Sequence, residues 1–126
     1  MIRNRFLSGV TGVALTIGAG VAQEASAQSI AVAYCKTTMS FGMAKGASEG
    51  RAAEIALRHC SGGAGSTQLG CCKFVKATDV GCIAIAVGPT GEYGVDTGST
   101  QMEAISAAVE ECPEKGCVAK MARCLD

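Results

Sequence analysis

An internal repeat constrains this chain more than any other feature of the sequence. Residues 46–60 (GASEGRAAEIALRHC) recur 52 positions later as residues 98–112 (GSTQMEAISAAVEEC). In both copies, a glycine and small hydroxyl residues precede apolar positions spaced i, i+3, i+4 and i+7, which predicts an amphipathic helix. The apolar positions are Ala53, Ile55, Ala56, Leu57 and Cys60 in the first copy, and Ile105, Ala108, Val109 and Cys112 in the second.

Residues 1–27 have the pattern of a secretory signal peptide. Arg3 and Arg5 precede an uncharged run over residues 6–23, and Ala25-Ser26-Ala27 provides a small-residue cleavage site. Four glycines within the first 27 residues disfavour a membrane-spanning helix. We therefore expect cleavage before Gln28, a periplasmic or secreted location, and no membrane insertion of the product.

The remaining chain, residues 28–126, is predicted to form a single small domain. Without Arg3, Arg5 and Glu24 it holds nine basic and ten acidic residues, neither of them clustered. This balance argues against nucleic acid and anionic membranes as partners. Only 23 of its 99 residues are Val, Ile, Leu, Met, Phe or Tyr, and 13 are glycine. Such a thin core calls for covalent support.

Eight cysteines provide that support. All lie within residues 28–126, and an even number in an exported chain predicts four disulfides in preference to free thiols or metal ligands. We expect no cofactor and no metal, since His59 is the single histidine and no Cys-x-x-Cys occurs. Repeat symmetry makes a pair of Cys112 with Cys117 equivalent to a pair of Cys60 with Cys71 or Cys72. Cys82 opens the second copy and Cys124 closes the chain, so we expect these two to pair and to clasp the copies together, which leaves Cys35 for the unused member of Cys71 and Cys72.

Strands are predicted around the helices. Residues 29–35 and 82–88 alternate larger side chains with alanines, which indicates strands with two unlike faces, and we place the helices against the alanine faces. A turn and a second strand follow each one, at residues 41–45 and 92–96. Lysine-bearing closing strands are expected at residues 72–77 and 117–123.

The fold class that results is α+β, with two ββαβ repeats at residues 29–79 and 82–126. We expect an antiparallel-type sheet and two helices in one disulfide-stabilised domain, with the repeats either sharing a sheet or packing across a pseudo-twofold axis. Ser48 is the expected cap of the first helix. Thr100 and Glu103 form a T-x-x-E capping box, in which the hydroxyl and the carboxylate each accept a backbone N–H of the other residue.

Residues that suggest catalysis are few. His59 lies at a predicted helix end directly before a half-cystine, and Glu110, Glu111 and Glu114 cluster late in the second helix. A capping histidine and a solvated acidic face explain them more simply than an acid–base pair. Met39 and Met43 are best explained as packing residues.

The chain from residue 28 onward resembles the bacterial family catalogued as domain of unknown function 4189. The resemblance is carried by the alanine-rich strands at residues 30–33 and 83–86, the pattern Ala53-x-x-Ala56-Leu57-x-x-Cys60, and the Gly-Cys steps at residues 70–71 and 116–117. It implies a small exported or membrane-attached domain without an established activity. The second hairpin strand departs from the family pattern, because Tyr93 is its one aromatic residue.

We therefore expect an exported, non-enzymatic binding module of the cell envelope with a protein partner, such as an inhibitor or immunity-type protein. The expected display elements are the loop between Cys60 and Cys71 and the hairpin tips. Two alternatives stay open. One is a small envelope enzyme that uses His59 or nearby acids, and the other is a structural envelope component that self-associates.

Overall fold

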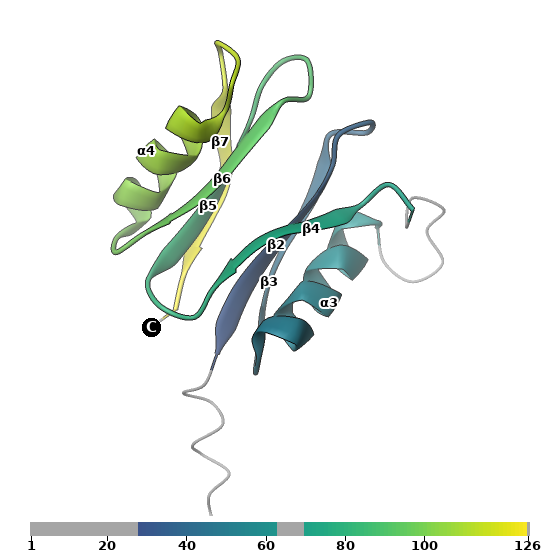
Figure 1. Ribbon diagram of the computed structural model, residues 1–126, viewed down its shortest axis with the longest axis vertical. Helices are drawn as coiled ribbons and strands as arrows, with labels where there is room; N and C mark the ends of the chain where they lie inside the picture. Colours follow the sequence, from purple (N-terminus) through teal and green to yellow (C-terminus); the bar gives the residue numbers. More distant parts are fainter. Residues whose placement is uncertain (1–27, 63–69, 126) are drawn as a thin grey trace, which may run out of the picture.

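The computed structural model describes residues 28–62 and 70–125, which form two ββαβ units in tandem (Figure 1). The first unit contains β2 (Ser29–Cys35), β3 (Ser40–Gly46), α3 (Glu49–Cys60) and β4 (Lys73–Thr78). The second contains β5 (Cys82–Val87), β6 (Tyr93–Gly98), α4 (Gln101–Glu111) and β7 (Val118–Cys124). The predicted α+β class and the two ββαβ repeats are confirmed.

Each unit builds its own three-stranded antiparallel sheet. The strand order is β3-β2-β4 in one and β6-β5-β7 in the other, so the alanine-rich strand is central and the closing strand is an edge. The repeats therefore pack against each other and do not share a sheet. In Figure 1 the two helices lie on the outer sides of the molecule, with both sheets between them.

The two unlike faces of the central strands create the layers. Larger side chains from both sheets meet in one inner core. The alanine faces instead pack against the helices, in a small cluster within each unit. The inner core comprises Ile30, Val32, Tyr34, Met43, Ile83, Ile85, Val87 and Val95. Two thin sheets thus obtain a shared core that neither repeat could form alone.

Glycines on β3 and β6 let the helices approach these strands closely. A Cβ atom at Gly42 would overlap the Ala56 carbonyl oxygen and lie 2.5 Å from the Cys60 nitrogen. At Gly94 it would overlap the Ala108 carbonyl oxygen in the same way. Helix and strand are therefore in backbone contact, which leaves room only for alanine between them.

This close approach corrects the predicted helix stripes. The fully buried helical positions are Ala52, Ala56, Ala104 and Ala108, whereas Ile105 is half-buried and Val109 is 37% exposed. The bulky residues flank a narrow alanine seam and do not form it.

Neither helix begins at the first residue of its repeated stretch, because Gly46 and Gly98 are the last residues of β3 and β6. Ser48 caps α3 by accepting the Arg51 N–H at 3.2 Å, as predicted. Thr100 caps α4 by accepting the Glu103 N–H at 3.1 Å, but the Glu103 carboxylate accepts the N–H of Ser99 at 3.0 Å. The main return bond is therefore made by the residue before the predicted partner, and the Thr100 N–H contributes only weakly to the lowered pKa of Glu103.

Candidate functional site

The two hairpin turns, residues 36–39 and 88–92, lie together at one end of the molecule, which we call the hairpin end (Figure 1). The Tyr34 hydroxyl donates a hydrogen bond to the Gly91 carbonyl at 2.8 Å, and the Tyr34 and Tyr93 rings lie 4.6 Å apart. Lys36 and Glu92 form an ion pair at 2.8 Å. Each turn is thus held by residues of the other repeat.

Two of these groups have shifted pKa values. Burial raises the pKa of Tyr34 above its usual value of 10.0, and the nearby Glu92 charge raises it further. The hydrogen bond and charge of Glu92 raise the pKa of Lys36. Both shifts favour the neutral phenol and the charged amine, the forms in which these groups join the repeats.

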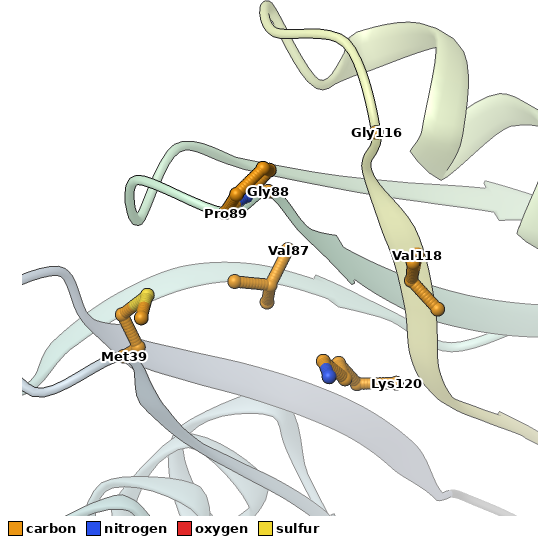
Figure 2. A pocket seen from close by; sticks show the side chains of 7 residues that line it. All are labelled: Met39, Val87, Gly88, Pro89, Gly116, Val118 and Lys120. Carbon is orange, nitrogen blue, oxygen red and sulfur yellow. The ribbon is translucent and has the colours of Figure 1, made fainter.

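An open cavity of about 460 Å³, the Lys120 cavity, lies on one side of the hairpin end. Figure 2 shows Val87 at its floor, Lys120 extending from β7, and Met39 on the opposite side. Met39 sits in the turn of the first repeat with a positive φ of 57°. The cavity is therefore formed by both repeats. Its lining residues are Met39, Val87, Gly88, Pro89, Gly116, Val118 and Lys120.

A second cavity of about 500 Å³, the Lys73 cavity, lies at the start of β4. It is more aromatic and polar than the Lys120 cavity, and Phe74 is 42% exposed beside it. Its lining residues are Tyr34, Lys36, Thr37, Gly70, Cys71, Lys73, Phe74, Val75 and Tyr93.

The two cavities occupy equivalent places in the two repeats. Each lies where the central strand ends beside the start of the closing strand, with Tyr34 opposite Lys73 in one and Val87 opposite Val118 in the other. A residue from the other repeat's hairpin closes each cavity. Duplication has therefore given two versions of one hollow with different linings.

A β-bulge places one lining residue in each cavity. The β5–β7 register shifts between Ile85 and Ala86, which leaves Lys120 as the extra residue of β7. The equivalent shift in the first sheet leaves Val75 as the extra residue of β4. Bulges redirect side chains at sheet edges and beside sites. Lys120, which stays exposed to solvent, thereby lines a largely apolar hollow.

The turn beside the Lys120 cavity is braced by Glu114. Its carboxylate accepts the Thr90 N–H at 3.1 Å, the Thr90 hydroxyl at 2.9 Å and the Glu92 N–H at 3.3 Å. Gly88 leaves space for this side chain, since a Cβ atom there would overlap it. Glu114 therefore holds the turn, a role that the acidic cluster in the sequence did not indicate.

The other residues that the sequence suggested for catalysis do not line either cavity. His59 is exposed at the end of α3 and lines neither cavity, and Glu110 and Glu111 are exposed on α4. Among residues 28–62 and 70–125, no three His, Cys, Asp or Glu side chains are grouped so that they could hold a metal ion.

The cysteines form four disulfides, Cys35–Cys71, Cys60–Cys72, Cys82–Cys124 and Cys112–Cys117. Adjacent Cys71 and Cys72 serve two different bridges, one to the end of β2 and one to the end of α3. All but Cys82–Cys124 lie at the hairpin end. Cys82–Cys124 joins β5 to β7 within the second repeat, so the expectation that it clasps the two copies together is wrong. These bonds tie together the elements that carry the cavities.

The two methionines that were predicted to be packing residues differ in their surroundings. Met43 packs in the inner core, whereas Met39 is 44% exposed and lines a cavity.

Most of the predicted display loop, residues 63–69, lies outside the described residues, as does the predicted signal segment 1–27. In the described part of the chain, no helix is long and apolar enough to span a bilayer.

Comparison with models of protein families matches residues 29–124 to the family described as Domain of unknown function (DUF4189). The match runs from the first residue of β2 to the last residue of β7 and so covers both repeats. Neither the curated proteins nor the solved structures gave a match.

Proposed function

The chain belongs to the DUF4189 family, and we propose that it is an exported, non-enzymatic binding module of the cell envelope whose hairpin end recognises a protein partner. The observation that carries this proposal is the pair of equivalent cavities, each closed by the opposite repeat. Cavities of this size, beside exposed Met39, Phe74 and Val118, suit the insertion of partner side chains.

Rigidity of the hairpin end supports the proposal. Cys35–Cys71, Cys60–Cys72 and Cys112–Cys117 fix the start of β4, the end of α3 and the connection from α4 to β7. Glu114 and Tyr34 hold the turns between them. A surface that is ordered before binding loses little conformational entropy when a partner docks. An inhibitor or immunity-type role would exploit such a preformed surface.

Export is supported by two independent features. Disulfides form and persist in the periplasm and outside the cell and are rare in the cytosol. The N-terminal sequence has the charge, apolar run and Ala-Ser-Ala site of a signal peptide. We propose a periplasmic or secreted location on these grounds.

The test is quantitative capture from envelope and secreted fractions. The full chain, expressed through an export pathway so that its disulfides form, would be immobilised through its C-terminus, because β7 ends opposite the hairpin end (Figure 1). We expect one protein to be retained in a constant molar ratio. Met39→Glu or Phe74→Glu should abolish its retention, because a carboxylate would be placed in the contact surface.

Val80→Glu is the matched control. Val80 is 73% exposed and lies in the connection from β4 to β5, opposite the hairpin end. Capture should survive this change. Loss of capture with Val80→Glu alone, retention with both hairpin-end variants, or recovery of no stoichiometric protein from any fraction would contradict the proposal. Self-association of the chain without a foreign protein would favour the structural alternative.

A further inference from the structure

We propose that the Lys120 cavity binds a small organic anion, a monocarboxylate with an apolar body, whose carboxylate pairs with the Lys120 ammonium group. The inference goes beyond the proposed function, because a protein partner can use the hairpin end without any small ligand. It rests on the shape, the lining and the charge of this one cavity.

The apolar side chains that line the Lys120 cavity indicate that the ligand has an apolar body. Val87 forms the floor, and Met39 and Val118, which are 44% and 57% exposed, stand on opposite sides (Figure 2). Val118 pairs with Val87 in the β5–β7 ladder and lies on the sheet face that is buried at Val87. Its exposure therefore marks a part of the inner face of β7 that the first repeat leaves uncovered. A volume of about 460 Å³ falls within the range of small-molecule sites.

The positive charge of Lys120 indicates that the ligand is an anion. Among the described residues, Lys120 is the one charged residue in the lining, and no carboxylate lies within 4.0 Å of its ammonium group. Glu114, on the adjoining connection, is occupied by Thr90 and the Glu92 N–H. A cation at an apolar hollow favours a ligand that supplies both a negative charge and apolar surface.

The bulge also has a simpler explanation, against which the test must discriminate. Lysines and bulges on edge strands prevent sheets from pairing edge to edge, and β4 carries the same combination at Lys73, Val75 and Lys76. Edge protection accounts for a charge on β7. It does not account for a charge that lines a hollow with an exposed methionine on the facing wall.

Methionine-methyl NMR of the disulfide-bonded protein can test the inference directly. Met39 lines the cavity, Met43 is buried in the inner core, and Met102 is 70% exposed on α4. The probes are sodium octanoate, octanol and an octylammonium salt, all below their aggregation concentrations. We expect octanoate to shift the Met39 methyl saturably while Met102 stays unchanged, and octanol and octylammonium to bind at least about tenfold more weakly.

Substitutions separate the carboxylate pair from apolar adsorption. Lys120→Gln should weaken octanoate binding at least about tenfold, Lys120→Arg should preserve it, and Lys73→Gln, in the equivalent cavity, should leave it unchanged. Val118→Glu supplies a competing carboxylate beside Lys120 and should abolish it. An unshifted Met43 methyl in each variant reports that the inner core is intact.

Three outcomes would overturn the inference. They are the absence of a saturable Met39 shift, equal responses to octanoate and octanol, and octanoate binding that persists in both Lys120→Gln and Val118→Glu. The proposed function fails separately, because it depends on capture of a stoichiometric protein. Because a partner side chain and the anion would occupy the same cavity, the two proposals also predict that octanoate competes with capture of the protein at that cavity.

Discussion

The hydroxyl group of Tyr34, the penultimate residue of β2, donates a hydrogen bond to the carbonyl oxygen of Gly91 in the turn of the other repeat. The two residues are 57 positions apart in the chain, and the bond is 2.8 Å long and buried. One repeat therefore fixes the hairpin of the other. The hairpin end depends on this contact between the copies as much as on the turns themselves.

The Tyr34 contact gives a prediction at alkaline pH. Because burial raises the pKa of Tyr34, with Glu92 adding to the effect, its phenol should ionise above its usual value of 10.0. A pKa raised by folding stabilises the protein fully below the unfolded-state value, and the stabilisation is lost as pH rises through the folded-state value. Tyrosinate absorbance measured with increasing pH should show one late titration that coincides with loss of stability.

Tyr34→Phe is the control for this titration. It should remove the late absorbance step and cost about 1 kcal/mol at neutral pH through the lost hydrogen bond. If the variant keeps the same alkaline loss of stability as the parent protein, Tyr34 is not its origin.

The backbone contact at Gly42 gives a second prediction. Gly42→Ala should destabilise the protein by about 1–3 kcal/mol or more, because the new methyl group meets the α3 backbone, which cannot move aside cheaply. Gly50→Ala is the matched change, since a Cβ atom there has no neighbour within 4 Å. It lies within α3 and should stabilise the protein by up to about 1 kcal/mol. Urea unfolding of both variants measures the contrast, and equal effects would refute the backbone contact.

The disulfides should contribute unequally. Cys82–Cys124 spans 42 positions and Cys112–Cys117 spans 5. On the chain-entropy model, removing the long bridge by alanine at both positions costs about 4 kcal/mol and removing the short one about 2 kcal/mol. Thermal and urea unfolding of the two double variants would give this order. The reverse order would show that chain entropy does not dominate.

The start of α4 should weaken at acid pH. Hydrogen bonds from the Ser99 hydroxyl and the Ser99 N–H lower the pKa of Glu103 below its usual value of 4.5. A pKa lowered by folding stabilises the protein above the unfolded-state value, and that stabilisation is lost as pH falls through the folded-state value. The protection of the Ser99 amide, taken as its exchange rate relative to the intrinsic rate at each pH, should therefore fall at the acid end.

Variants at two glutamates complete this prediction. Glu103→Gln should remove the acid dependence of Ser99 exchange, whereas Glu110→Gln, on the exposed part of the same helix, should leave it in place. A Ser99 amide that exchanges at the same relative rate across this range would contradict the assigned role of Glu103.

The repeat, the strands and the helices could be predicted because they depend on local patterns. Alternation at Ile30 and Ile83 identifies strands with two faces, and Ser48 and Thr100 mark the helix starts. The glycines of β3 and β6 carried a further signal that was missed. Gly42 and Gly46, like Gly94 and Gly98, are spaced four apart on the strand that the helix touches.

The cavities could not be predicted, because they arise from how one repeat packs on the other. Nothing near Met39 in the sequence indicates that it faces Val118, and the position of Lys120 depends on a bulge that the alternation pattern does not encode. Glu114 looked like part of an acidic cluster, and only the folded turn reveals its partners.

The missing side chain at Gly42 has a consequence for the mouth of the Lys120 cavity. Gly42 follows Met39 by three residues, and peptide-to-peptide contact with α3 fixes the height at which β3 leaves the hairpin. Any substitution that adds bulk between Gly42 and α3 should therefore also displace Met39, and so change the width of the cavity opening that faces solvent.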